Sequence, residues 1–216
     1  MANILGGKGS LFDQFIGEIR NIEVQTDRMR FRRNLERIGE LMAYEISKEL
    51  DWKEGIITTP LGEARLPLIK AQPVLATILR AGLGLHQGFL NYFDLGDNCF
   101  ISAYRMNHKD DGSFDIKIEY LSSPSIEDRV VILSDPMLAT GGSMVLAYKA
   151  LLRRGNPKHV HIACAIASRE GLEYCQRHLP ENVTFWIGGL DEELTAQAYI
   201  VPGLGDAGDL AYGNKE

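Results

Sequence analysis

From residue 73 onward, short apolar runs alternate with helical segments along the chain. "PVLATIL", "RVVILS" and "HVHIACAIA" are dominated by apolar residues, which indicates strands buried on both faces. Between them lie helical stretches such as "SMVLAYKALLRR", which Gly155, Asn156 and Pro157 bring to an end. Continuous apolar strands that alternate with helices are typical of a parallel sheet covered on both faces. The pattern therefore predicts an α/β fold.

A long amphipathic helix precedes this region, over residues 27 to 50. Its apolar residues recur at steps of three and four, so they share one face, and Thr26 or Asp27 can cap the first turn. This face consists of Phe31, Leu35, Ile38, Met42, Ile46 and Leu50. The opposite face carries Arg28, Arg30, Arg32, Arg33 and Arg37. We expect the basic face to be solvated, with an interface or an effector site as the open alternatives.

The segment "FDIKIEYL" alternates strictly between apolar and polar residues and follows a "DDG" turn signal. It predicts a β-hairpin arm, paired with the strand that ends near Arg105. The arm includes Asn107, His108 and Lys109 beside this turn. Two roles for the arm stay open: a lid that excludes water from a site, or a support for a subunit interface.

Composition limits the class of protein. At 216 residues, 45% of them hydrophobic, the chain can bury a substantial core, and we expect a single domain over residues 1–216. A formal net charge of −6 argues against nucleic acid as a partner, because such binding normally leaves a basic footprint. The three cysteines lack the spacing of a zinc site or a disulfide framework. No apolar run reaches about 18 residues, so we expect a cytoplasmic protein without a membrane segment.

The stretch "VVILSDPMLATGGSMV" combines a buried strand with a polar loop and the start of a helix. Asp135 follows the strand directly, at the sheet edge where ligands of such folds bind. Gly141 and Gly142 allow the backbone to turn tightly, and Thr140 and Ser143 offer hydroxyl groups. The first N–H groups of the helix have no partners within it. Together these features predict a cradle for an anion, most plausibly a phosphate, with a carboxylate suited to sugar hydroxyls.

Other phosphate-binding motifs do not fit this loop. A Walker A loop requires GxxxxGK[ST], and the loop has no lysine. The dinucleotide pattern GxGxxG is also absent from it. From the pattern alone, an ordinary strand-to-helix turn remains the alternative.

Four segments resemble the uracil phosphoribosyltransferase family. "DPMLATGGS" is similar to the family's signature for phosphoribosyl pyrophosphate (PRPP), with Pro136 where many relatives carry a second acid. "ILRAGLG" at 78–84 resembles the family's pyrophosphate loop, and "YR" at 104–105 resembles its second arginine site. "YIVPGLGDAGD" at 199–209 resembles the uracil-binding loop and is the most specific of the four. "RRNLERIGELMAYE" and "TPLGE" also match the family's N-terminal region, so the resemblance spans nearly the whole chain, with the motifs in the expected order.

The resemblance implies a phosphoribosyltransferase-like parallel sheet flanked by helices, with a hairpin arm and a C-terminal hood loop that binds the base. It implies an enzyme that transfers the phosphoribosyl group of PRPP to uracil, giving UMP and pyrophosphate. Arg80, Arg105 and Asp206 are the implied catalytic residues, with both arginines on pyrophosphate. The implied PRPP-binding residues are Arg80, Arg105, Asp135, Pro136, Met137, Leu138, Ala139, Thr140, Gly141, Gly142, Ser143 and Asp206. The implied uracil-binding residues are Ile200, Gly205, Asp206 and Ala207.

The resemblance also implies a cofactor and partners. Mg²⁺ would accompany PRPP, with Asp206 helping to hold it indirectly, since this ion needs few carboxylates when phosphates are present. Relatives form homodimers or homotetramers and some respond to GTP, so we expect a homo-oligomer with GTP as a candidate effector.

Two rival interpretations remain at this stage. One keeps the chemistry and changes the base to another oxopurine or oxopyrimidine. The other is a nucleotide-sensing regulator that binds RNA, against which the negative net charge and the intact uracil loop both argue. Small departures from the family, such as "LAYG" after "GDAGD" and "SREGL" at 168–172, leave every implied contact in place.

Overall fold

The computed structural model describes residues 1–108 and 114–214, and the side chains of residues 103–118 lie outside that description. Its main feature is a sheet in the order β1, β10, β9, β7, β4, β5, β6, with the short β8 also pairing with β9. Neighbours in this order run parallel except β5 and β6. The strands are β1 (Ala2–Ile4), β4 (Val74–Leu79), β5 (Asn98–His108), β6 (Phe114–Ser122), β7 (Val130–Ser134), β8 (Met137–Leu138), β9 (His159–Ser168) and β10 (Val183–Asp191).

Successive residues of the central strands face opposite sides of the sheet and enter two different cores. In β7, Ile132 packs into the core on the side of α2, whereas Val131 and Leu133 pack into the core on the side of α4. All three are fully buried. Because helices cover both faces, these strands are apolar throughout, and the predicted parallel sheet between two helical layers is confirmed.

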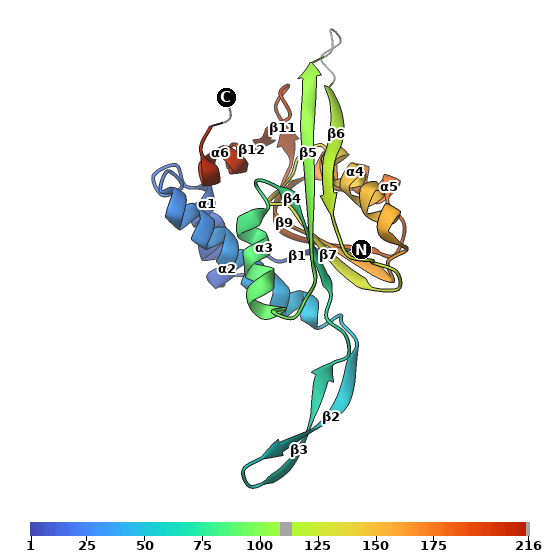
Figure 1. Ribbon diagram of the computed structural model, residues 1–216. Helices are drawn as coiled ribbons and strands as arrows, with labels where there is room; N and C mark the ends of the chain where they lie inside the picture. Colours follow the sequence, from blue (N-terminus) through green and yellow to red (C-terminus); the bar gives the residue numbers. More distant parts are fainter. Residues whose placement is uncertain (109–113, 215–216) are drawn as a thin grey trace.

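The two helical layers are clearly separate in Figure 1. On one face lie α1 (Leu11–Arg20), α2 (Arg28–Ser47) and α3 (Leu83–Tyr92), and on the other lie α4 (Gly142–Leu151), which continues into the short η1 (Leu152–Arg154), and α5 (Arg169–His178). The predicted amphipathic helix is α2, and Asp27 caps it by accepting a hydrogen bond from the N–H of Arg30 at 3.0 Å. Within the described parts of the chain, no helix combines the length and apolar character needed to cross a membrane.

The apolar and basic faces of α2 lie in different environments. Every residue predicted for its apolar face is buried, including Leu50, although the helix itself ends at Ser47. The basic face is solvated in part: Arg28, Arg30 and Arg33 are exposed as expected, whereas Arg32 and Arg37 are half-buried. Arg30 pairs with Glu18 of α1 at 2.9 Å, and this contact, together with hydrogen bonds from Asn34 and Gln14, lowers the pKa of Glu18 to about 2. Arg32 donates a hydrogen bond to the backbone carbonyl of Ala211 near the C-terminus at 2.7 Å.

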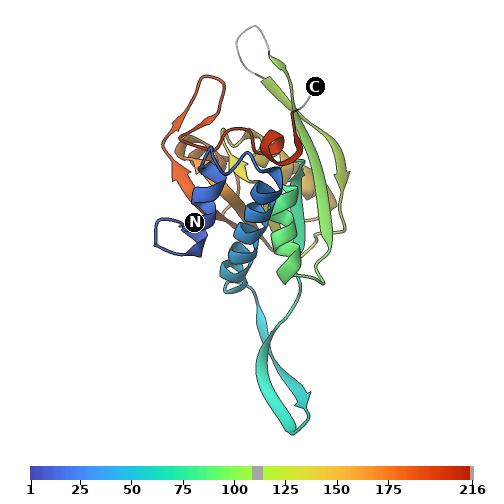
Figure 2. The same ribbon diagram turned by 90° about the vertical axis from the view of Figure 1, so that its left-hand side faces the viewer.

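Two hairpins extend from opposite ends of the molecule (Figures 1 and 2). The first is the predicted arm, since β5 and β6 pair antiparallel with Arg105 opposite Ile116. Its predicted "DDG" turn lies outside the described residues. The second, β2 (Trp52–Thr59) and β3 (Gly62–Ile69), was not predicted from the sequence. Its exposed apolar side chains are Trp52, Ile56, Ile57, Leu61, Leu66 and Leu68.

The connections diverge at the sheet edge between β4 and β7. These two strands are parallel neighbours. The helix that follows β4 is α3, on one face, whereas the helix that follows β7 is α4, on the other face. The loops that leave the two strands therefore separate, and they leave a crevice outside the carboxyl ends of the sheet.

Candidate active site

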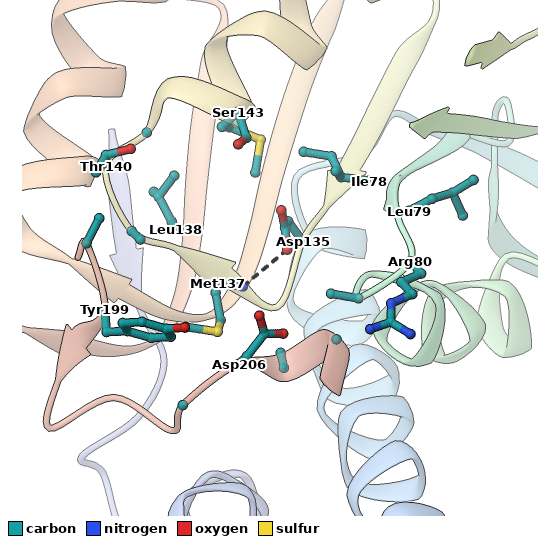
Figure 3. Close-up of a pocket in the computed structure, with 18 of the residues that line it drawn as sticks. Ile78, Leu79, Arg80, Asp135, Met137, Leu138, Thr140, Ser143, Tyr199 and Asp206 are labelled. Carbon is teal, nitrogen blue, oxygen red and sulfur yellow. Dashed lines mark hydrogen bonds between the residues drawn. The ribbon is translucent and has the colours of Figure 1, made fainter. Parts of the chain in front are cut away.

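A cavity of about 860 Å³ occupies this crevice (Figure 3). Three segments far apart in the sequence form its walls: the loop after β4, the loop after β7, and the C-terminal loop that leads into α6 (Ala207–Tyr212). Before α6 this C-terminal region forms a small antiparallel pair, β11 (Glu193–Leu194) with β12 (Ile200–Val201). The cavity has the size of an ordinary small-molecule site. The predicted ligand-binding edge of the sheet is therefore hollow.

Contacts with α5 and β9 hold the loop after β7 in a tight shape. Gly141, the N-cap of α4, has a φ of 83°, a left-handed conformation that favours glycine. A side chain there would lie 2.8 Å from the carbonyl oxygen of Gly171 and 2.9 Å from Sγ of Cys175. Behind the loop, the hydroxyl of Ser168 donates to the carbonyl of Ala139 at 2.6 Å. The loop thus brings backbone to the cavity at the start of α4, as an anion cradle requires.

Asp135 follows β7 directly, and its carboxylate faces that of Asp206 (Figure 3). Its Oδ1 accepts a hydrogen bond of 3.4 Å from the N–H of Met137. Burial raises the pKa of Asp135 from 3.8 to about 7, and the nearby charge of Asp206 adds to this effect. A carboxyl group in this condition favours partners that stabilise its charge, such as hydroxyl donors or a cation.

Arg80 follows β4 directly, and the peptide bond that joins it to Leu79 is cis. Its Nη2 donates to Oδ1 of Asp209 and to the carbonyl of Gly213, both at 2.7 Å. Its Nε is buried, with no hydrogen-bond partner among the described residues. Because a guanidinium group has five N–H donors in a fixed fork, Arg80 retains donors for a ligand anion after these two bonds.

Left-handed glycines bend the C-terminal loop, and a partly buried ion pair holds it in place. Gly203 and Gly205 have φ values of 55° and 93°. Arg20 of α1 and Asp191 of β10 form two hydrogen bonds of 2.8 Å with each other. Both also bind Gly203, whose carbonyl accepts from Arg20 and whose N–H donates to Asp191. Beyond the bend, the carboxylate of Asp206 caps α6.

Most of the predicted site residues meet at this cavity. Its walls include Arg80, Asp135, Met137, Leu138, Ala139, Thr140, Gly141, Ser143, Gly205, Asp206 and Ala207. Predicted site residues from three separate motifs therefore line the same cavity.

Three predicted residues do not line the cavity. The carbonyl of Pro136 accepts from the N–H of Ile166 in β9, so this part of the loop faces the sheet. Gly142 is the first residue of α4, after Gly141. The side chain of Ile200 is buried in the hydrophobic core, which leaves only its backbone for a ligand. For Arg105, the backbone lies in β5, and its side chain is outside the described part of the chain.

Other wall residues were not predicted. Tyr199 lines the cavity (Figure 3), as do Ser102 and Met144. Tyr199 opens the segment "YIVPGLGDAGD", so its position in the predicted base-binding loop was a usable signal. Ser102 lies inside β5 and Met144 inside α4, where the local pattern indicates only a strand and a helix.

The fold is that of the phosphoribosyltransferase class of proteins. The same fold is found in adenine phosphoribosyltransferase from Trypanosoma brucei, with a TM-score of 0.55, 12% identity, and coverage of 88% of this chain and 83% of that one. A solved protein from Aquifex aeolicus is much more similar, with a TM-score of 0.86, 29% identity, and coverage of 99% and 98%.

The sequence profile of the uracil phosphoribosyltransferase family matches residues 10–214, and the chain belongs to this family. The uracil phosphoribosyltransferase of Porphyromonas gingivalis is 58% identical over 211 residues, which cover 98% of this chain and 97% of the relative. That of Methanothermobacter thermautotrophicus is 39% identical over 185 residues, 85% of this chain and 83% of the relative.

Proposed function

We infer that the protein transfers the phosphoribosyl group of PRPP to uracil, giving UMP and pyrophosphate, in pyrimidine salvage. Membership of the uracil phosphoribosyltransferase family over residues 10–214 carries this conclusion. The cavity supports it, because an anion cradle, a carboxylate pair and an arginine converge on one space of suitable size.

The proposed reaction breaks the bond between the anomeric carbon and pyrophosphate and forms a bond from that carbon to a ring nitrogen of uracil, which gives up its proton to the leaving pyrophosphate or to solvent. Positive charge develops on the ribose and negative charge on the leaving pyrophosphate. The protein does no covalent work in this scheme, so positioning and electrostatic stabilisation supply most of the rate.

Each part of PRPP has a proposed partner. The 5′-phosphate would bind the backbone of Ala139 to Ser143, at the N-terminus of α4. The ribose hydroxyls would donate to Asp135. Burial has raised the pKa of this carboxyl group, and the hydroxyl donors would stabilise its charged form. Pyrophosphate would bind Arg80, whose buried Nε has no partner among the described residues, and Arg105 as its second arginine.

Uracil would bind beside the C-terminal loop. Its ring has a pattern of hydrogen-bond donors and acceptors that differs from that of cytosine, and backbone groups of Ile200, Gly205 and Ala207 would read this pattern. The left-handed Gly205 and the Gly203 bend support such backbone recognition, because they expose N–H and C=O groups. Tyr199 lines the same side of the cavity and adds an aromatic wall.

We also propose that Mg²⁺ accompanies PRPP at this site. No cluster of three or more His, Cys, Asp or Glu among the described residues could hold a metal by itself. The facing carboxylates of Asp135 and Asp206 still fit Mg²⁺, which often binds through one or two carboxylates together with phosphates. When bound, the ion would neutralise charge on pyrophosphate.

The direct test is to incubate the purified protein with PRPP, Mg²⁺ and each nucleobase in turn, and to measure the nucleotide and pyrophosphate formed. UMP from uracil alone is expected, and Asp206→Asn should abolish most of it. Turnover of a different base would keep the chemistry and overturn the substrate, whereas no turnover with any base would overturn the enzyme.

A homo-oligomer remains our expectation, and the β2–β3 hairpin supports it. Leu61 at its tip is fully exposed, and Leu66 is 49% exposed. Apolar side chains gathered on a projecting hairpin are typical of a surface that is covered in an assembly.

An effector role for GTP also remains an expectation. A second cavity of about 560 Å³ lies between α2, α3, β5 and Tyr212, and could receive a small ligand. Its walls include Arg32 and the buried His86, whose Nδ1 has no hydrogen-bond partner among the described residues. Measuring the rate of UMP formation against GTP concentration tests this role.

A further inference from the structure

Arg80 is held at one end of its guanidinium group by the C-terminal segment. Nη2 bonds to Asp209 and to the carbonyl of Gly213, which places two acceptors on the same nitrogen. The Arg80–Asp209 ion pair is about two-thirds buried on both sides. Of the remaining donors, Nε is buried and unpartnered among the described residues. Holding Nη2 in this way restricts the direction in which the rest of the fork can point.

The segment that holds Arg80 is itself held by α2. Arg32 donates to the carbonyl of Ala211 at 2.7 Å, and its guanidinium carbon lies 6.0 Å from the centre of the Tyr212 ring. The guanidinium of Arg28 lies beside Gly213, where an added Cβ would be 3.4 Å from Nη2 of Arg28. These contacts join the basic face of α2 to the last turn of α6.

The short helix α6 also carries residues of the base-binding loop. Asp206 caps it through a 3.0 Å hydrogen bond from the N–H of Asp209. Gly208 of this helix lies close to both groups, because a Cβ there would lie 3.2 Å from Oδ1 of Asp206 and 3.7 Å from Nε of Arg80. One rigid turn of helix therefore sets the position of Asp206 and of Arg80 together.

We propose that Asp209 and Arg32 are positioning residues for the transfer reaction: Asp209 orients Arg80 toward pyrophosphate, and Arg32 fastens α6 so that Asp206 and Asp209 keep their places. The inference rests on the proposed function, because it assigns Arg80 to pyrophosphate. It gives the basic face of α2 a part in the site although Arg32 does not line the main cavity.

The opposite effect of Asp209 is also physically reasonable and gives a sharp test. A carboxylate beside Arg80 repels an anionic ligand and competes for the same guanidinium. If competition dominates, removal of the charge strengthens pyrophosphate binding. If positioning dominates, the same change weakens it, because Arg80 then pays the entropy of ordering its side chain upon binding.

The first experiment compares the wild-type protein with Asp209→Asn and Asp209→Glu. The matched control is Asp97→Asn, which breaks the Asp97–Arg129 pair away from the cavity. We expect Asp209→Asn to raise the KM for PRPP and the dissociation constant of magnesium pyrophosphate about tenfold, a change that corresponds to about 1.4 kcal/mol. The KM for uracil should stay unchanged, and Asp209→Glu should bind pyrophosphate with intermediate affinity.

Calorimetric titration with magnesium pyrophosphate, beside thermal unfolding, separates the outcomes. Unchanged or tighter pyrophosphate binding in folded Asp209→Asn overturns the positioning role, as does an equal rise in the KM for uracil. Should Asp209→Asn not fold, Asp209→Glu provides the same comparison. A wild-type protein that forms no UMP contradicts the proposed function instead, independently of these binding measurements.

The second experiment compares Arg32→Met with Arg33→Met. Arg33 lies on the same helix but pairs with Glu36 at 2.7 Å, away from α6. We expect Arg32→Met to raise the KM for both PRPP and uracil, because α6 loosens as a unit, and Arg32→Lys to restore part of the loss. Wild-type KM values in Arg32→Met, or equal effects of the two methionine variants, overturn the role of Arg32.

Discussion

At the scale of single residues, Asp135 shows how position changes chemistry. An ordinary aspartate is ionised at neutral pH, but burial beside Asp206 raises the pKa of Asp135 to about 7. The folded protein therefore holds the proton of Asp135 more tightly than the unfolded chain does. It follows that Asp135 lowers the free energy of unfolding as the pH rises from about 4 to about 7.

The variant Asp135→Asn tests this loss of free energy of unfolding. At pH of about 8 the variant should be more stable than the wild-type protein, by at most about 4 kcal/mol, since one pKa unit corresponds to about 1.4 kcal/mol. At pH of about 5 the difference should shrink, because Asp135 is then protonated in the folded protein. Urea unfolding at both pH values measures it, and an equal difference at the two would contradict the raised pKa.

Activity should depend on the same ionisation, but it should increase with pH where stability decreases. In the proposed reaction Asp135 must be ionised to accept from both ribose hydroxyls, so kcat/KM for PRPP should rise as the pH increases through about 7 and then level off. A pH profile measured at low PRPP concentration tests this expectation. A flat profile from pH of about 6 to about 8 would show that Asp135 does not control binding.

At the scale of elements, the N-terminus of α5 supports the proposed phosphate cradle from behind. Ser168 caps α5 by accepting from the N–H of Gly171 at 2.9 Å, and its hydroxyl donates to Ala139 in the cradle. A side chain on Gly171 would collide with the carbonyl of Ala139, so helix and loop pack backbone to backbone. The shape of the cradle thus depends on a helix that does not line the cavity.

Ser168→Ala should affect both stability and substrate binding. Loss of the cap should lower the free energy of unfolding by about 1 kcal/mol. The KM for PRPP should also rise, because the carbonyl of Ala139 loses its donor. The control is Ser123→Ala, which removes a hydroxyl that donates to Pro124 away from the cavity. A KM for PRPP that is equal in the two variants would mean that Ser168 serves α5 alone.

At the scale of the whole molecule, the two hairpins project from opposite ends of the sheet (Figure 1). The β2–β3 hairpin exposes apolar side chains along most of its length, and Leu61 has no cover at all in the single chain. Such exposure is unusual for a monomer, and an assembly that covers the hairpin would account for it.

Replacing Leu61 and Leu66 together with aspartate should reduce the mass of the assembly in sedimentation velocity. Charge on a covered apolar surface opposes association, because its burial without a partner is costly. Leu95→Asp provides the control, since Leu95 is also highly exposed (79%) but lies outside the hairpin. An unchanged mass for the double variant would exclude the hairpin as the contact between copies.

The sequence by itself determined the features that depend on neighbouring residues. Apolar runs and their spacing were enough for the parallel sheet and for α2, because each element is specified by a local period. The tight turn at Gly141 was also predictable, since a left-handed turn before a helix favours glycine. The C-terminal loop was found through family resemblance rather than through local pattern.

Only the tertiary structure decided how these pieces act on one another. The raised pKa of Asp135, the hold of Asp209 on Arg80 and the attachment of Arg32 to Ala211 all join segments far apart in the chain. The exposure of the β2–β3 hairpin is a further example, because its apolar residues cannot be told from core residues by sequence, and only the fold shows that they are exposed. Burial and long-range contact depend on the whole packing, so no local stretch of sequence contains them.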